Sequence, residues 1–170
     1  MTQTNQKYEL LDTDTVTTPS GRALKRIRAL VAIGSLVAAG ELGGYIESEA
    51  NLDCDGDAWV YGNAQVSGDA WVSGNARVSG DAWVSGNARV SGDAQIEQRT
   101  DLFWLSIIGS ENGTYTAFKN KDGGILVNRG CFNGTLEEFT DAVNKRHDGK
   151  FNQEYQLVIE LTKLRLGQEV

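Results

Sequence analysis

The most regular feature of the chain is a pattern of small, aliphatic and polar residues that repeats every six positions between Asn51 and Ile96. The six units of residues 57–92 each hold an alanine, a valine two residues later and a closing glycine. A short fixed period with aliphatic residues in phase is typical of a solenoid. Because side chains alternate across a strand, alanine and valine are expected to point inward and the residue between them outward. The inward valines are Val60, Val66, Val72, Val78, Val84 and Val90.

The number of units in one coil decides which outward side chains stack. Two units per coil would align the aspartates that open alternate units in a column of like charges, which is unfavourable. Three units, an 18-residue coil, alternate aspartate with asparagine along every corner and bring indoles beside guanidinium groups, which attract each other by about 0.5–1 kcal/mol at exposed sites. The predicted neighbours are Trp59 with Arg77, Trp71 with Arg89, and Gln65 with Trp83. We therefore predict a triangular coil; a two-unit coil with a ladder of mutually attracting tryptophans is the alternative.

The repeat unit V-S-G-N-A-R resembles the hexapeptide repeat of left-handed β-helices, in which an aliphatic residue is followed by turn-forming residues and a small residue. The segments RALKRIRAL and GELGGYIESEANL before the array, and GCFNGTLEEF after it, resemble a family of phage and prophage proteins of unassigned function. The first resemblance covers the array and implies the fold. The second covers most of the chain and implies a phage setting.

The segment before the array is predicted to form three short strands, Tyr8–Leu11, Thr15–Thr18 and Ala23–Leu30. Pro19 to Gly21 predict the turn between the last two strands. The glycine-rich stretch from Gly40 to Gly44 predicts a loop that enters the first coil.

The segment after the array is predicted to form a three-stranded meander from Leu102–Ile108, Thr114–Phe118 and Ile125–Asn128, with hairpin turns at Asn112-Gly113 and Asp122-Gly123. Thr135 and Glu138 form a capping box that starts a helix. A second helix is expected from about Gln153 to Leu166, where apolar residues recur at helical spacing.

These elements predict a mainly β protein: a short left-handed triangular β-helix with an N-terminal β cap and a C-terminal α+β module of a three-stranded meander plus two helices. The expected divisions are residues 1–44 for the cap, 45–98 for the β-helix and 99–170 for the α+β module.

The net charge of the chain limits the kinds of molecule that it is expected to bind. The net charge of −7 argues against a generic nucleic-acid binder, which is expected to be basic. One basic cluster stands out, and we interpret it as a solvated strand face rather than an anion site. Its residues are Arg22, Lys25, Arg26 and Arg28.

The N-terminal sequence lacks the layout of a secretory signal, and the apolar stretch Leu30–Ala39 is too short to span a bilayer. We therefore expect a protein of the bacterial cytoplasm with both cysteines, Cys54 and Cys131, reduced. Cys54 falls in the inward column, so it is predicted to be buried.

Catalytic and metal chemistry find little support. Hexapeptide β-helices are often acyltransferases with a histidine near the coils, but the single histidine, His147, lies far beyond the array. A Cys131–His147 nucleophile pair is a weaker alternative. Asp53, Asp55 and Asp57 lack the spacing of a calcium loop. No catalytic residue, metal or cofactor is therefore expected.

The outward tryptophans and arginines of the array are the candidate binding residues, because exposed indoles are unusual on an isolated monomer. They are Trp59, Trp71, Trp83, Arg77 and Arg89. We expect a non-enzymatic, phage-type accessory protein that forms a homo-oligomer and counters host defence by binding a host protein or a small nucleotide-like ligand in a cleft between subunits. The alternatives are a structural scaffold or virion protein and, less favoured, an acyltransferase.

Overall fold

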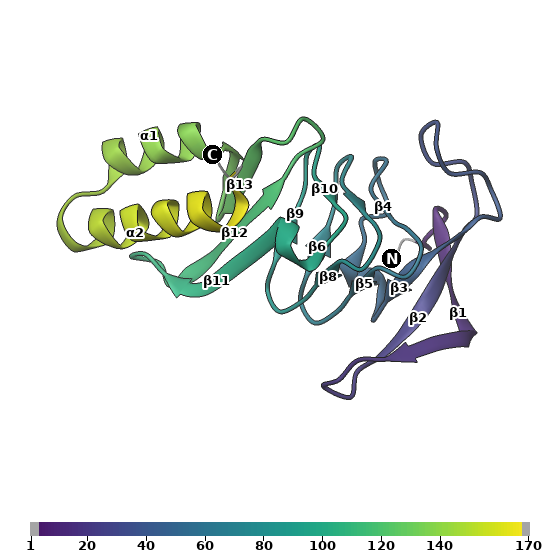
Figure 1. Ribbon diagram of the computed structural model, residues 1–170. Helices are drawn as coiled ribbons and strands as arrows, with labels where there is room; N and C mark the ends of the chain where they lie inside the picture. Colours follow the sequence, from purple (N-terminus) through teal and green to yellow (C-terminus); the bar gives the residue numbers. More distant parts are fainter. Residues whose placement is uncertain (1–3, 168–170) are drawn as a thin grey trace.

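The computed structural model describes residues 4–167. Its centre is a stack of two-residue parallel strands, one at each predicted extended segment of the array (Figure 1). They are β4 (Trp59–Val60), β5 (Gln65–Val66), β6 (Trp71–Val72), β7 (Arg77–Val78), β8 (Trp83–Val84), β9 (Arg89–Val90) and β10 (Gln95–Ile96). Between them lie turns that contain glycines with positive φ.

The strands pair in parallel with the strand three units later. Trp59 pairs with Arg77 and Trp71 with Arg89, each eighteen residues later along the chain. The Trp59 N–H donates to the Ala76 carbonyl at 3.0 Å, and equivalent bonds follow around each coil. This register places three units in each coil, as predicted, and the two-unit alternative is wrong.

The corner residues follow the same register. The Asn75 side-chain amide donates to the Asp93 carboxylate at 3.3 Å, so an amide stands between charges where a two-unit coil would have stacked carboxylates.

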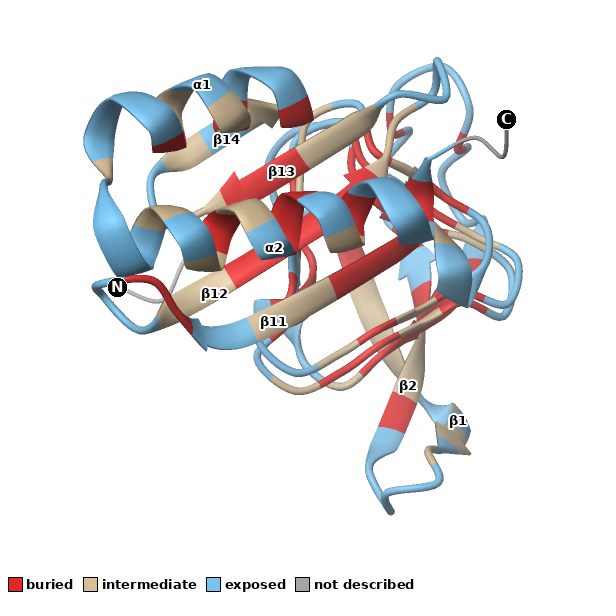
Figure 2. Ribbon diagram, turned by 60° about the vertical axis from the view of Figure 1, so that its left-hand side comes forward, coloured by how far each residue is buried: buried red, intermediate tan, exposed pale blue. Residues whose placement is uncertain are grey.

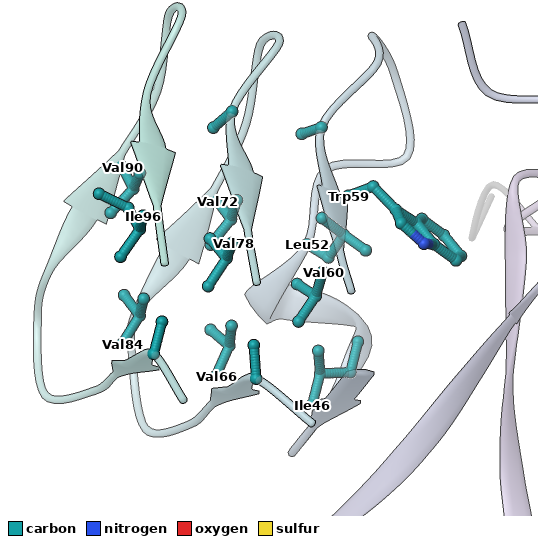
Figure 3. Close-up of a cluster of buried hydrophobic side chains, with 14 of the residues drawn as sticks. Ile46, Leu52, Trp59, Val60, Val66, Val72, Val78, Val84, Val90 and Ile96 are labelled. Atoms are coloured by element: carbon teal, nitrogen blue, oxygen red, sulfur yellow. The ribbon is translucent and has the colours of Figure 1, made fainter. Parts of the chain in front are cut away.

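Alanine and valine fill the interior of the stack. The repeat valines and alanines are fully buried, and in Figure 3 the aliphatic side chains of successive coils lie over one another. Ile46 and Leu52 extend these columns in the first coil. Each buried valine contributes about 1.5–3 kcal/mol relative to exposure, so the stack supplies much of the stabilisation of the fold.

The N-terminal strands join one side of the stack. β1 (Tyr8–Thr17) pairs antiparallel with β2 (Ala23–Ala29), and β2 pairs with β3 (Leu42–Ile46), which continues in parallel onto β5 and β8. The two predicted strands within residues 8–18 are thus one strand, whose pairing shifts between Leu11 and Thr15.

The loop predicted over Gly40–Gly44 is partly wrong, because β3 begins at Leu42. A Cβ on Gly43 would meet the Val60 carbonyl and the Ile27 side chain at 2.6 Å. A Cβ on Gly44 would meet the Ala64 carbonyl at 2.6 Å. These glycines are required by close strand packing rather than by a turn.

The basic cluster is neutralised by acidic residues of the neighbouring strands, which agrees with its interpretation as a polar strand face. Three of the four cations pair with β1, and the fourth pairs with the residue after β3. The pairs are Lys25 with Asp12 at 2.6 Å, Arg26 with Asp14 at 2.6 Å, Arg28 with Glu9, and Arg22 with Glu47 at 2.8 Å.

Cys54 is exposed, so the prediction that it is buried is wrong. A short 3₁₀ helix, Glu49–Asn51, precedes it, and residues 53–57 bend outward instead of forming a strand. The inward column is therefore interrupted between Leu52 and Ala58.

The C-terminal module is an antiparallel sheet with two helices on one face (Figures 1 and 2). A short 3₁₀ helix, Arg99–Asp101, leads into it. Its elements are β11 (Leu102–Ile108), β12 (Gly113–Lys119), β13 (Ile125–Arg129), β14 (Phe132–Thr135), α1 (Leu136–Arg146) and α2 (Gly149–Leu166).

The capping box at the start of α1 is present, since the Thr135 hydroxyl accepts from the Glu138 N–H at 3.2 Å. The meander has a fourth strand, β14, which was not predicted because it is short, contains Gly134 and runs directly into the capping box. Helix α2 begins at Gly149, four residues before the predicted start.

Alternate residues of β12 face opposite sides of this sheet. Phe118 belongs to the core of the solenoid, whereas Tyr115 and Ala117 pack with the helices. The Tyr115 hydroxyl lies 2.7 Å from the Thr162 hydroxyl of α2, which itself donates to the Val158 carbonyl. The sheet is thus packed between the solenoid and the two helices.

Two glycines provide a test of the coil register. Gly62 and Gly80 have φ of 58° and 59°, but a Cβ on Gly62 meets nothing within 4 Å, whereas a Cβ on Gly80 overlaps the Glu97 carbonyl of the next coil. We expect Gly62→Ala to cost about 1–2 kcal/mol for the left-handed backbone alone. Gly80→Ala should cost clearly more in denaturant unfolding. Equal losses would contradict the stacking at that corner.

The stability of the fold at alkaline pH should depend on the buried hydroxyl of Tyr115. Burial raises the pKa of this hydroxyl to about 12 from its usual 10.0. The unfolded chain therefore releases the proton at lower pH than the fold, so stability is unaffected below pH 10 and falls between pH 10 and 12. Tyr115→Phe should flatten this decline by about 2 kcal/mol in unfolding measured across that range. An unchanged slope in the variant would contradict the assignment.

Candidate functional site

A cleft of about 710 Å³ lies where the β6–β9 face of the solenoid meets strands β12, β13 and β14. Trp71 and Arg89 form the solenoid side. Asn128, Arg129 and Asn133 form the opposite wall. The cleft is complete within one chain, whereas the sequence suggested a cleft between subunits.

Trp71 and Arg89 occupy equivalent positions in neighbouring coils, which is why they meet. The strand register pairs them, and the Arg89 guanidinium carbon lies 5.7 Å from the centre of the indole ring. The Trp71 residue is 38% exposed, so part of its ring faces solvent in the cleft. This pair is confirmed as the predicted indole–guanidinium neighbour.

Hydrogen bonds fix the opposite wall onto the solenoid. The Asn128 amide donates to the Arg89 carbonyl at 2.8 Å and to the Ser91 hydroxyl at 3.0 Å. The Asn133 side-chain amide donates to the same Ser91 hydroxyl at 2.9 Å. The backbone N–H of Arg89 donates to the Thr116 hydroxyl at 3.0 Å. These hydrogen bonds of Asn128, Asn133 and Thr116 form a seam between the sheet and the solenoid, and the seam sets the distance between the two walls of the cleft.

Arg129 is a partly buried cation without an acidic partner among residues 4–167. Its Nη2 donates to the Ile108 carbonyl at 2.9 Å, and its Nε is buried without a hydrogen bond. Burying a charge is costly unless it is paired. Asp69 is the one acidic residue that lines the cleft, on the solenoid side. Arg89 and Arg129 thus both line the cleft, although the contacts of the Arg129 guanidinium with the Ile108 carbonyl and the Tyr155 ring place it toward the helix side of the sheet.

The other predicted site residues lie outside this cleft. Trp59 projects from its coil toward the N-terminal segment (Figure 3) and is fully buried, with its ring 6.2 Å from that of Tyr8. The prediction that Trp59 is exposed is therefore wrong, because a segment far away in sequence covers it. Trp83 is half-buried beneath Arg99, whose guanidinium carbon lies 3.4 Å from the ring centre.

Arg77 is exposed and lines a separate groove of about 280 Å³ with Tyr61 and Asn75. The structure thus brings together two of the five predicted residues, Trp71 and Arg89. Sequence reasoning missed Arg129, Asn128 and Asn133. The only signal for them was a polar stretch at the β13–β14 turn.

Cys131 and His147 line one smaller cavity of about 100 Å³ beside the cleft. The His147 ring lies 5.3 Å from that of Tyr155, and Cys131 is exposed. Among the described side chains no hydrogen bond joins the two, so the geometry does not add to the case for a nucleophile pair. His147 lies at the end of α1, away from the coils.

The acidic stretch Asp53–Asp57 surrounds a lysine. The Lys7 ammonium donates to the backbone carbonyls of Asp53 at 2.9 Å and Ala58 at 2.8 Å. Burial lowers the pKa of Lys7, while the nearby aspartates oppose this shift. Within residues 4–167, no three acidic, cysteine or histidine side chains converge as metal ligands.

The repeat region is similar to a known family. Residues 58–74, 70–86 and 82–98 match the family model for the YdcK Beta solenoid repeat, which supports a β-solenoid repeat over that part of the chain. The matched part includes Trp71 and Arg89 but ends before the opposite wall of the cleft. The curated proteins contain no match to the chain.

The structure also bears on membrane insertion. Across residues 4–167, neither helix has the length and apolar character needed to cross a bilayer.

The seam predicts unequal roles for two asparagines. Asn128→Ala removes the side-chain donor to the Arg89 carbonyl at a position that is only 9% exposed. Because the carbonyl then lacks this partner, we expect the free energy of unfolding in urea to fall by about 1–3 kcal/mol. Asn133→Ala is the matched control, because Asn133 is exposed and shares its acceptor with Asn128, so its loss should stay within about 0.5 kcal/mol. Equal losses would show that Asn128 does not hold the seam.

Proposed function

We propose that the protein is a non-enzymatic binding module that holds a small, planar, anionic ligand of nucleotide type in the cleft between the solenoid and the C-terminal sheet. The observation that carries this proposal is the placement of an exposed indole beside a guanidinium group in a cleft that a second arginine also lines. Trp71 and Arg89 lie on one wall, and Arg129, which has no acidic partner among residues 4–167, lies on the other.

Each group has a role in such a complex. Stacking of a base on the exposed part of the Trp71 ring contributes about 1–3 kcal/mol. Guanidinium groups bind phosphate through paired, charge-assisted hydrogen bonds, a role that suits Arg89 beside the indole of Trp71. Exposed Asn87 and Asn133 provide donors and acceptors for hydroxyl groups or a base edge. The cleft volume of about 710 Å³ lies within the range of small-molecule sites.

The biological role that we propose is that of a phage-type accessory protein acting in the bacterial cytoplasm, which counters host defence by sequestering a nucleotide signal. The resemblance of the flanking segments to phage proteins supports this setting. In the same proposal the solenoid is a left-handed triangular β-helix whose open ends are covered by the flanking modules. The three-unit register and the presence of Tyr8 and Phe118 in the solenoid core support that arrangement.

Homo-oligomer formation is part of the proposal but is not needed to complete the cleft. Exposed leucines on α2 support an interface with a second copy or with a host protein, since Leu157 is 73% exposed and Leu164 is 82% exposed, one heptad apart. Light scattering of the purified protein would decide between an oligomer and a monomer. A monomer at all concentrations would remove this part and leave the ligand site intact.

Calorimetric titration with a panel of cyclic dinucleotides, cyclic mononucleotides and ADP-ribose tests the ligand proposal. We expect at least one member to bind, with affinity reduced about ten- to one-hundredfold by Trp71→Ala or Arg89→Ala, because each removes a stacking or charge-assisted contact. Arg77→Ala is the matched control, since Arg77 occupies the same repeat position in another groove.

Absence of heat with the whole panel, or an equal loss of affinity in Arg77→Ala, would contradict the proposal. A thermal shift with acyl-CoA that depended on His147 would instead favour an acyltransferase.

A further inference from the structure

A second, smaller cavity lies beside the cleft and has a different chemistry. Its volume is about 100 Å³, and it lies between the β13–β14 turn, helix α1 and the first half of α2. Apolar side chains line it: Phe132 from β14, and Phe139, Ala142 and Val143 from α1. Such a volume matches one ring or one branched aliphatic group rather than a nucleotide.

Aromatic contacts hold the walls of this cavity in place. The ring of Phe139 lies 5.2 Å from Phe132 and 5.6 Å from Tyr155, both in edge-on geometry. Tyr155 also contacts His147, with ring centres 5.3 Å apart. Phe139 and Tyr155 are buried in the core of the C-terminal module. A ligand therefore enters a cavity that is already formed, with little loss of conformational entropy in the protein.

The rim of the cavity carries positive charge that the protein does not neutralise well. Arg129 lies over the Tyr155 ring, with its guanidinium carbon 5.9 Å from the ring centre, and its Nε is buried without a partner. Arg146 pairs with Glu111 at 3.5 Å, but both side chains are about two-thirds exposed, so this ion pair holds Arg146 only weakly. A carboxylate at the mouth would meet at least one cation without an acidic partner in the described chain.

We propose that this cavity binds a small aryl or branched aliphatic carboxylate, with its apolar body against Phe132, Phe139 and Val143 and its carboxylate on Arg129. The site goes beyond the proposed nucleotide cleft and does not depend on it. Arg129 belongs to the wall of both, so occupation of one site changes the charge available to the other. A ligand of this size binds with a dissociation constant of about 0.1–1 mM.

The test uses 3-phenylpropionate as the probe and 3-phenylpropan-1-ol as its uncharged counterpart of similar shape. Ligand-observed NMR measures binding of each to the full chain. Alkylation of the two cysteines followed by mass spectrometry locates the site, because Cys131 lines the cavity and Cys54 lies far away in the first coil, and both are exposed. We expect the acid to slow alkylation of Cys131 several-fold at millimolar concentration, to leave Cys54 unchanged and to bind at least tenfold more tightly than the alcohol.

Four variants separate this site from the cleft. Ala142→Phe places a ring in the cavity from a half-exposed position on α1 and should abolish binding of the probe, whereas Lys145→Phe on the exposed face of the same helix should not. Arg129→Gln should remove the preference for the acid over the alcohol. Trp71→Ala should leave binding of the probe unchanged even if no nucleotide binds, so failure of one site is distinguishable from failure of the other.

Equal binding of acid and alcohol, or unchanged protection of Cys131 in Ala142→Phe, would overturn the assignment. Should Ala142→Phe fail to fold, as judged by circular dichroism, the comparison of wild type with Arg129→Gln still decides the question.

Discussion

Parallel backbone pairing between coils eighteen residues apart is the constraint on which the rest of the molecule depends. Bonds such as that from the Trp59 N–H to the Ala76 carbonyl determine which side chains face each other on every wall. The aliphatic core alone does not determine the offset, because a slip by one six-residue unit would still place valine over valine. Such a slip would bring aspartate over aspartate at the corners. The interior therefore selects the phase of the repeat, and the polar exterior selects the number of units per coil.

This division explains how much could be predicted from sequence. The coil register, the buried valines and the contact between Trp71 and Arg89 follow from residues within one or two coils of each other, so periodicity contains them. The burial of Trp59 depends on Tyr8, which lies more than one coil away in an aperiodic segment. The exposure of Cys54 depends on a bend at the point where the repeat begins. Contacts between periodic and aperiodic segments carry no signature in a single sequence.

The cleft likewise combines a periodic wall, which the repeat predicts, with an aperiodic wall, which it does not. Arg77 and Arg89 are equivalent within the repeat, yet only Arg89 lies in the large cleft, because the C-terminal sheet packs beside that face of the solenoid. The pairing of charges also distinguishes the C-terminal sheet from the N-terminal strands. The cations of β2 are each paired with a carboxylate, in keeping with a structural role, whereas Arg129 is not. Arg129 is a half-buried guanidinium without a carboxylate partner in the described chain, and the residue lines both cavities.

The mismatch between a sequence period of two units and a coil of three units limits how such a protein can lengthen or shorten. Adding one or two units would rotate everything downstream and move the C-terminal sheet to a different face, away from Trp71 and Arg89. Adding three units would restore the face but break the alternation of aspartate and asparagine once, which brings like residues together. Six units, two full turns of the coil, are the smallest insertion that preserves both, so duplications in this architecture should be tolerated in pairs of turns.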